Sequence, residues 1–310
     1  MSHIPVLLNE VIEAFEPHPG KFIIDGTVNG GGHAEALIKK ITPGGIFLGV
    51  DLDGQILERT KDRIESNLKI KNWDLKILFA HDSYSNLPKI IEQKVLPKAD
   101  GLLLDLGFSS EQLEAKRGFA YRGEDKLNEP LDMRYDPSSA KASEGVAPTA
   151  AEVLNSYREE ELADIFWKYG EERFARRIAH GIVEARKEQR IITVGELIDA
   201  IKKSVPQFFK KGETDVTMRI FQALRIYVNS ELENIEKVLG ELDRIVNKGG
   251  RVAIITFHSL EDRLVKNKFK ELEENGTVKI LNKKPIVPKD EEITQNPRSR
   301  SAKLRTIQII

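Results

Sequence analysis

The chain has no cysteine among its 310 residues. This absence excludes disulfide bonds, a catalytic thiol and cysteine-ligated zinc or iron–sulfur clusters. The sequence also has no apolar run long enough to span a bilayer. Its N-terminal stretch has neither the basic region nor the cleavage site of a signal peptide. We therefore expect a cytoplasmic protein with no membrane partner.

An excess of charge of either sign is missing too. Lys and Arg number 48 against 49 Asp and Glu, so the net charge of −1 gives no overall attraction to nucleic acid. Hydrophobic residues make up 40% and charged residues 31%, which is typical of a globular chain with one large domain or two smaller ones. No cluster of His, Asp or Glu has the spacing of metal ligands, so we expect no metal. The sequence leaves the oligomeric state open.

Two distant stretches each end a buried-looking strand in an acidic turn that contains glycine. The first is residues 21–33, which includes Asp25, and the second is residues 100–110, which includes Asp105. Asp51 ends another apolar segment between them. In an open α/β sheet, ligands bind beyond the carboxyl ends of the strands. These carboxylates therefore predict one pocket.

The loop after Asp25 argues against a phosphate-containing ligand. Gly30 and Gly32 begin a dinucleotide fingerprint, but Glu35 stands where its third glycine belongs. No Gly-Lys-Ser/Thr follows, so the loop is not a P-loop. A cationic nucleoside such as S-adenosylmethionine (SAM) suits an acidic pocket, and Asp51 can accept two hydrogen bonds from a ribose diol. The alternative is that the glycines only form a tight turn.

The first third of the chain alternates between expected strands and expected helices. The strands are expected at residues 21–25, 46–51, 75–80 and 101–105, and the helices between them at 33–40, 55–68 and 87–92. Alternation of this kind predicts an α/β fold with a mostly parallel sheet that is covered on both faces.

The alternation stops after residue 112. No strand signal appears over residues 149–206, whereas capping boxes at Thr149, Ser156 and Thr193 predict helices. We expect a helix over 171–187 and one long helix over 218–242, followed by a buried strand at 251–257, a helix with Ser259 as its N-cap, and an edge strand at 304–310. The expected domains are a SAM-binding domain formed by 1–112 and 214–310, and a mainly helical insert over 113–213 for substrate recognition.

Several motifs together resemble one family. They include Asp25-Gly-Thr, Gly31-Gly-His33, Leu103-Leu-Asp105-Leu-Gly, Arg117-Gly-Phe119, Pro130-Leu-Asp-Met-Arg134, Phe257-His-Ser-Leu-Glu-Asp-Arg263 and Asn296-Pro-Arg-Ser-Arg-Ser-Ala-Lys-Leu-Arg305. With these motifs the chain resembles the bacterial small-subunit ribosomal RNA (cytosine-N4)-methyltransferases of the H type. The resemblance runs over nearly the whole chain, from His3 to Arg305.

The resemblance implies a Rossmann-like class I methyltransferase that transfers a methyl group from SAM to N4 of a cytosine. The cytosine would lie in the decoding region of the small-subunit ribosomal RNA, within an assembled or assembling subunit. By motif position, the resemblance also implies contacts to the cofactor, which fall on Gly31, Gly32, His33, Asp51, Tyr84, Asp105 and Gln112. Tyr84 stands where the family usually has Phe, and it should still stack on adenine.

Asp105 is the expected catalytic carboxylate. The exocyclic amine of cytosine is a poor nucleophile because its lone pair is delocalised into the ring. A carboxylate that accepts a hydrogen bond from this N–H can localise the lone pair and hold it in line with the methyl group. The alternative is that Asp105 only caps the turn that follows it.

His258 is the second candidate for catalysis, either as an acceptor of the amine proton or as a contact to the target base. It is equally consistent with an ordinary loop histidine. For RNA binding we favour Arg298, Arg300 and Lys303, which lie in a C-terminal stretch with seven basic and three acidic residues between 281 and 310.

Two other functional classes can be compared with this interpretation. A non-catalytic RNA-binding or ribosome-assembly factor on a methyltransferase fold would be favoured by loss of Asp105 or of the glycine loop, and both are present. A nucleotide-dependent oxidoreductase is disfavoured by Asp25 and Glu35.

Overall fold

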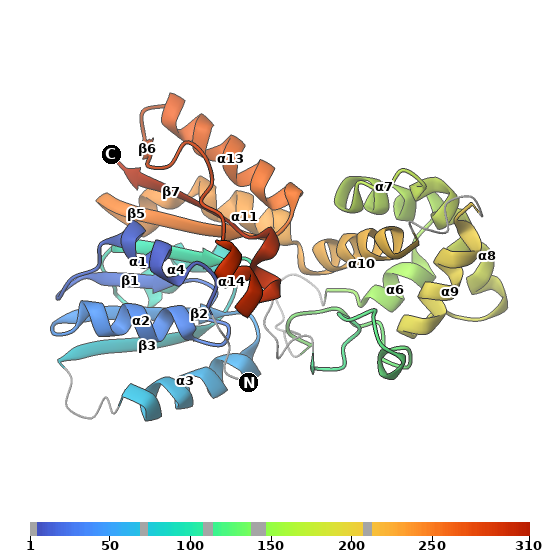
Figure 1. The fold of residues 1–310 in the computed structure, drawn as a ribbon, viewed down its shortest axis with the longest axis horizontal. Helices are drawn as coiled ribbons and strands as arrows, with labels where there is room; N and C mark the ends of the chain where they lie inside the picture. Colours follow the sequence, from blue (N-terminus) through green and yellow to red (C-terminus); the bar gives the residue numbers. More distant parts are fainter. Residues whose placement is uncertain (1–4, 69–73, 108–113, 138–146, 207–212) are drawn as a thin grey trace. The chain divides into compact units, whose positions relative to one another are not determined.

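The structure is a computed structural model, and it describes residues 5–68, 74–107, 114–137, 147–206 and 213–310. The chain divides into two compact units (Figure 1). One unit comprises Met1–Ser109 and Leu232–Ile310, and the other comprises Ser110–Glu231. No helix within the described ranges has the length and apolar character needed to cross a membrane.

The first unit is built on a seven-stranded sheet in the order β3-β2-β1-β4-β5-β7-β6. The strands are β1 (Phe22–Asp25), β2 (Gly45–Asp51), β3 (Leu75–His81), β4 (Ala99–Asp105), β5 (Val246–Thr256), β6 (Val278–Ile280) and β7 (Lys303–Ile309). The pairs from β3 to β5 are parallel, whereas β7 is antiparallel to both of its neighbours. This confirms the predicted α/β class with a mostly parallel sheet.

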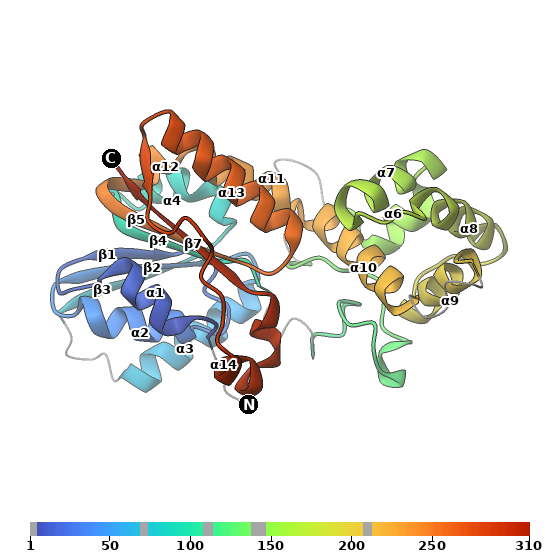
Figure 2. The same ribbon diagram turned by 45° about the horizontal axis from the view of Figure 1, so that its top comes forward.

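Helices cover both faces of this sheet (Figure 2). One face packs against α1 (Leu8–Phe15), α2 (Gly32–Ile41) and α3 (Gly54–Leu68), and the other packs against α4 (Leu87–Gln93), α11 (Glu231–Gly240), α12 (Leu242–Ile245) and α13 (Ser259–Glu274). Alternate residues of one strand serve the two cores, as Ile23 faces the first set of helices and Ile24 the second. A strand that is buried on both faces needs the continuous apolar run seen in the sequence.

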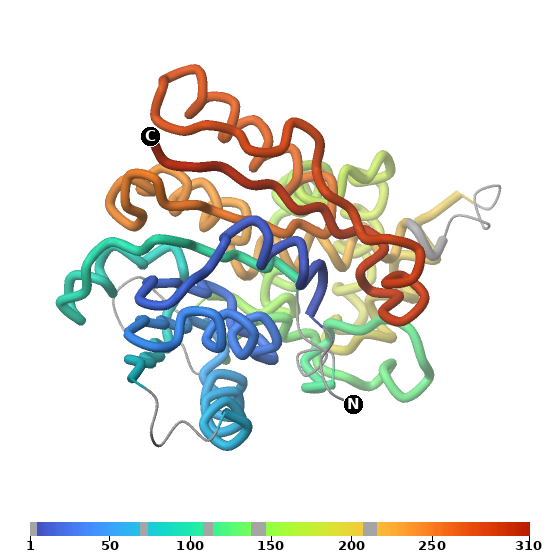
Figure 3. Tube along the Cα trace, turned by 60° about the vertical axis from the view of Figure 1, so that its left-hand side comes forward, coloured from blue at the N-terminus to red at the C-terminus, as the bar shows by residue number. Residues whose placement is uncertain are grey.

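Short elements complete the first unit: η2 (Tyr84–Asn86), α14 (Asp290–Gln295) and η5 (Pro297–Ser301). Figure 3 shows the C-terminal strand β7 in dark red, running beside β5. The expected edge strand at 304–310 therefore exists, but it is not at the edge, because the three-residue strand β6 pairs with its outer side.

The second unit is a set of helices joined by loops. It contains η3 (Glu124–Lys126), α6 (Ala150–Ser156), α7 (Glu159–Gly170), α8 (Ala175–Glu188), α9 (Val194–Ser204) and α10 (Glu213–Asn229). Helix α7 packs against α8 and α10, so the unit extends to Glu231 and includes the segment that follows residue 213. The Thr149 and Thr193 capping boxes form as predicted.

Several helix boundaries differ from expectation. The helix expected over 171–187 is α8 and begins at Ala175, because Glu171 is the C-cap of α7. Helix α6 runs through Ser156, and Arg158 rather than Ser156 is the N-cap of α7, with Glu161 completing its capping box. The helix expected over 218–242 is interrupted at Ser230, whose φ of 49° is left-handed and ends α10.

Candidate active site

Three buried carboxyl groups stand at the ends of three adjacent strands. They are Asp25, Asp51 and Asp105, the last residues of β1, β2 and β4. Each of these residues is at most 6% exposed. The sheet order β2-β1-β4 places these ends next to one another. The carboxylates of this predicted pocket therefore gather at the carboxyl ends of the central strands. They lie beside the switch point between β1 and β4, where the strand order reverses.

Burial dominates the electrostatics of this group. Loss of contact with water raises the pKa of Asp25 to about 8, that of Asp51 to about 6 and that of Asp105 to about 7, all from an ordinary value of 3.8. The neighbouring negative charges of Asp105 and Asp51 raise the pKa of Asp25 further. A site that disfavours negative charge in this way is stabilised by a bound cation.

Asp51 is held by backbone N–H groups. Its Oδ1 accepts a hydrogen bond from Asp53 N at 2.9 Å, and its Oδ2 accepts one from Asn29 N at 2.8 Å. Each carboxylate oxygen can accept a second hydrogen bond. The acceptors that a ribose diol requires are therefore present and fixed in orientation.

The turn between β1 and α2 packs closely against other parts of the unit. Gly31 is the N-cap of α2 with a φ of 70°, and a Cβ on it would lie 2.6 Å from Thr60. A Cβ on Gly32 would lie 2.9 Å from Pro5. A Cβ on Gly26 would lie 3.1 Å from the Cβ of Tyr84, so Tyr84 stands beside the end of β1. Gln112 lies outside the described residues.

Asp105 is oriented from several directions. Its backbone N–H donates to Thr27 Oγ1 at 2.6 Å, and its Oδ1 accepts from Gly107 N at 3.3 Å. Its Oδ2 lies 3.7 Å from His33 Nδ1. The second ring nitrogen of His33, Nε2, lies 2.9 Å from the carbonyl oxygen of Val6 and donates to it, because a carbonyl only accepts. His33 therefore presents Nδ1 to the carboxylate.

Comparison with known proteins identifies the group to which this site belongs. All 310 residues match the model of the MraW methylase family. The chain belongs to the MraW methylase family. A curated relative from Clostridioides difficile, named ribosomal RNA small subunit methyltransferase H, is 41% identical over 99% of both chains. A relative with the same name from Clostridium botulinum is 42% identical over 98% of this chain and 97% of its own. Another from Persephonella marina is 41% identical over 98% of both chains.

Solved structures resemble the chain more distantly. A crystal structure of an rRNA methylase from Streptococcus thermophilus aligns over 100% of this chain and 99% of its own, with 12% identity and a TM-score of 0.42. Membership of the MraW methylase family confirms the predicted class I methyltransferase fold, the predicted enzyme class and SAM as the cofactor. The donor set fits this cofactor, because fixed ribose acceptors and buried carboxyl groups suit a cationic nucleoside.

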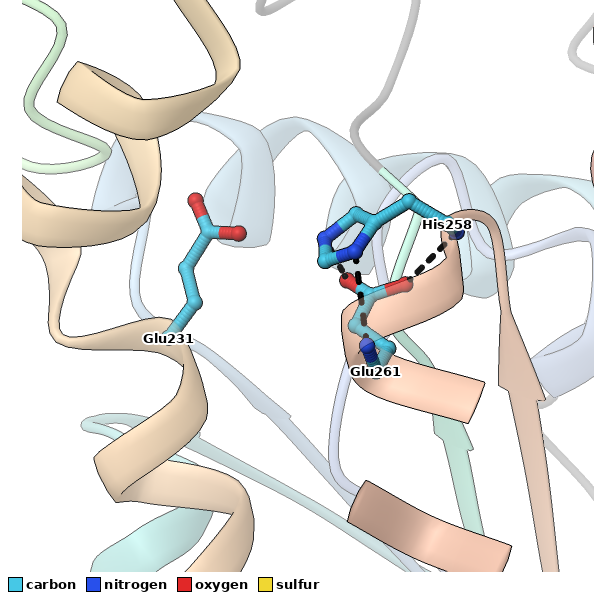
Figure 4. A group of neighbouring side chains, drawn as sticks. All are labelled: Glu231, His258 and Glu261. Carbon is cyan, nitrogen blue, oxygen red and sulfur yellow. Dashed lines mark hydrogen bonds and ion pairs between the residues drawn. The ribbon is translucent and has the colours of Figure 1, made fainter. Parts of the chain in front are cut away.

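His258 lies in a helix cap. It is the N-cap of α13, in place of the expected Ser259, and its Nδ1 accepts a hydrogen bond from Glu261 N at 3.3 Å (Figure 4). Glu261 in turn accepts from Phe257 N and His258 N, at 2.8 Å and 3.2 Å. Its other oxygen lies 3.0 Å from His258 Nε2. These contacts favour a structural role, and a catalytic role for His258 stays a prediction. Figure 4 also draws Glu231, which belongs to the second unit and binds Arg225 there.

The three candidate RNA-binding residues differ in their surroundings. Arg298 and Arg300 are exposed on η5, on either side of the fully buried Ser299. Lys303 Nζ instead lies 3.1 Å from Asp262, which Arg305 also binds at 2.7 Å. Hydrogen bonds from these two cations outweigh partial burial and lower the pKa of Asp262. The charge of Lys303 is therefore partly neutralised within the unit.

Two residues of the site, Thr27 and Asn29, are not predicted from the sequence. Both are polar residues in the turn that follows Asp25. Thr27 accepts a hydrogen bond from the backbone of Asp105 at the end of β4, and Asn29 donates to Gly107 in the turn after it. Polar side chains directly after a strand-ending carboxylate were a signal that could have been used.

Proposed function

We propose that this enzyme methylates N4 of a cytosine in the decoding region of small-subunit ribosomal RNA. The names of the relatives support ribosomal RNA as the substrate, because they are 41–42% identical over nearly their full length. The contact geometry of Asp105 supports an amine as the methyl acceptor. A ribosomal substrate, assembled or assembling, is the reason that we expect action in the cytoplasm.

SAM supplies the methyl group on a sulfonium centre. In the proposed reaction the carboxylate of Asp105 accepts a hydrogen bond from the amine N–H and keeps the nitrogen lone pair directed at the methyl carbon. The N4–C bond would form as the sulfonium C–S bond breaks, which leaves a neutral thioether, and the amine proton would pass to the Asp105 carboxylate. Holding the two reacting atoms in line is the main contribution of such a residue. The pocket would have to admit a cytosine that has left its stack. Asp51 would bind the ribose, and Tyr84 would stack on adenine.

The observation that carries this proposal is the buried, oriented carboxyl group of Asp105 at the end of β4. With a pKa of about 7, it is ionised in a large fraction of molecules at neutral pH, and its orientation is set by hydrogen bonds at both the backbone and the side chain. A residue that only caps a turn would need neither the burial nor the contact to His33.

The test is nucleoside analysis of small subunits from cells that lack this methyltransferase. After incubation with the purified enzyme and labelled SAM, we expect label in N4-methylated cytidine at a decoding-region position. Asp105→Asn and Asp105→Ala should reduce transfer at saturating SAM by about a hundredfold or more. Naked RNA is the comparison substrate.

Label in another nucleoside would contradict the cytosine assignment. Full activity of Asp105→Ala would contradict the role of Asp105. Tight subunit binding with no transfer by the wild-type enzyme would favour a ribosome-assembly factor instead.

A further inference from the structure

Asn29 occupies an unusual place in the turn between β1 and α2. It is 8% exposed and has a left-handed φ of 46°. Its side chain and its backbone make contacts to two different strand ends. We propose that Asn29 is a positioning residue that sets the orientation of the Asp105 carboxylate through the turn at residues 105–107. This inference rests on the proposed function of Asp105.

The side chain of Asn29 acts on the turn after β4. Its Nδ2 donates to the carbonyl oxygen of Gly107 at 3.2 Å and approaches that of Asp105 at 3.5 Å. Both neighbours are acceptors only, so the amide must present its nitrogen rather than its oxygen to them. The N–H of the same Gly107 donates to Asp105 Oδ1. The side-chain amide of Asn29 therefore fixes Gly107 through its carbonyl group, and Gly107 in turn fixes the Asp105 carboxylate through its N–H.

The backbone of Asn29 acts on the other strand end. Its N–H donates to Asp51 Oδ2 at 2.8 Å, and its carbonyl accepts from Thr60 Oγ1 at 2.6 Å. Neither contact involves the side chain. A substitution at this position can therefore disturb Asp105 and leave the support of Asp51 in place.

The left-handed backbone of Asn29 allows its side chain to be removed without straining the turn. Asn and Asp tolerate this conformation better than most residues, and Gly adopts it without a steric penalty. Asn29→Gly removes the amide without straining the turn. Asn29→Asp keeps the shape and the conformation but aims a carboxyl group at two carbonyl oxygens, in a site that already holds Asp25 and Asp51.

The experiment compares SAM binding with turnover in the full-length variants. For Asn29→Gly we expect the Kd and KM for SAM to stay within about twofold, while kcat falls about tenfold or more, because a misplaced carboxylate costs rate rather than affinity. Asn29→Asp should be at least as impaired. Val95→Gly is the matched control, because Val95 also has a left-handed φ of 50° but is 89% exposed in a surface turn. It should leave kinetics unchanged.

A second readout follows the ionisation of Asp105 itself, by carboxyl carbon NMR assigned with Asp105→Asn. Burial raises the pKa of Asp105 most, the hydrogen bond from Gly107 lowers it, and the charge of Glu261 raises it further. Other ionisable groups facing this region are Asp25 and His33. Loosening of the turn in Asn29→Gly should therefore raise the pKa of Asp105, whereas loss of stability alone would leave it in place.

Two results would overturn the inference. One is a loss of SAM affinity in Asn29→Gly that accounts for the whole loss of kcat/KM. The other is an Asp105 titration that is identical in Asn29→Gly and the wild type. If the wild type fails to methylate cytosine, the proposed function is wrong, yet the NMR titration still decides whether Asn29 positions Asp105.

Discussion

At the scale of single residues, the Asp105 carboxyl group can accept the proposed hydrogen bond well only when it is ionised, and its buried surroundings disfavour ionisation. Burial raises its pKa to about 7, and the nearby charge of Glu261 acts in the same direction. The proposed hydrogen bond from the amine requires an acceptor with a free lone pair, which the carboxylate supplies best. Catalysis is therefore tied to the titration of this group.

We expect kcat to rise with pH through the neighbourhood of 7 and to level off above it. The sign follows from the chemistry, because raising the pH removes the proton from Asp105 and creates the acceptor. Glu261→Gln keeps a hydrogen-bond acceptor for the cap of α13 but removes its negative charge. Its profile should therefore move to lower pH, by a few tenths of a unit or more. The measurement is single-turnover methyl transfer across pH.

The matched control is Glu274→Gln, an exposed substitution at the last residue of the same helix, which should leave the profile unchanged. A profile that is flat between pH 6 and 8, or one that moves to higher pH in Glu261→Gln, would contradict this account of Asp105.

The sequence could predict the three strand-ending aspartates, since each closes an apolar run that is readable in isolation. It could not predict the contacts that orient them. Thr27 contacts the end of β4 and Asn29 the turn after it, each across a separation of 78 residues, and only the pairing of β1 with β4 brings them together. His258 was ambiguous for a related reason, because its contact to Glu261 depends on where α13 begins.

At the scale of elements, apolar patterning and capping boxes predicted most helices of the second unit. The predictions failed where an element is too short to show a pattern or where its boundary depends on tertiary contacts. Strand β6 has three residues, too few for a recognisable pattern, and without it the sequence predicts β7 at the edge of the sheet. The sequence does not show the break at Ser230, because apolar residues recur at helical spacing on both sides of it. The side chain of Asn229 is engaged there with Met133 O and Tyr135 N, contacts that the periodicity cannot reveal.

The element η5 leads to a prediction about RNA affinity. Its two arginines are exposed, whereas Lys303, just beyond it, shares Asp262 with Arg305. Arg298→Gln with Arg300→Gln should weaken binding to small subunits by about tenfold and reduce the salt slope by about 2, because each lost phosphate contact releases about one counterion. Filter binding across salt concentrations measures both quantities.

Lys303→Gln serves as the matched control for charge. It removes one positive charge, where the double variant removes two, and it removes it from a side chain that is paired with Asp262. We therefore expect clearly less than half of the double variant's loss of affinity and little change in slope. Equal slopes for the double variant and the wild type would show that η5 does not contact phosphates.

At the scale of the whole molecule, the alternation of strands and helices predicted the parallel sheet. The extent of the second unit depends instead on packing that the alternation does not encode. The sequence predicts residues 214–231 as part of the SAM-binding domain, whereas α10 packs against α7 in the second unit. Boundaries of this kind depend on which apolar face a helix buries, and α10 has buried residues around most of its circumference.

The cluster of buried carboxyl groups has a consequence for the stability of the fold. Asp25 has a pKa of about 8 in the folded chain and about 4 when unfolded. Between these values the folded state holds a proton that the unfolded state has lost, so folding becomes less favourable as the pH rises. Above about pH 8 both states are ionised, and the contribution becomes constant and unfavourable.

Asp25→Asn should remove this dependence, because the amide oxygen can still accept the hydrogen bond from Thr27 N and carries no charge to bury. We expect the variant to gain stability relative to the wild type as the pH rises from 4 to 8, by more than about 1 kcal/mol in total. Denaturant unfolding at several pH values measures the difference, and taking it between two otherwise identical chains cancels the titration of the groups that are not coupled to Asp25; the coupled groups are Asp51 and Asp105. A constant difference across this range, or one of opposite sign, would mean that Asp25 is ionised in the folded chain at acidic pH.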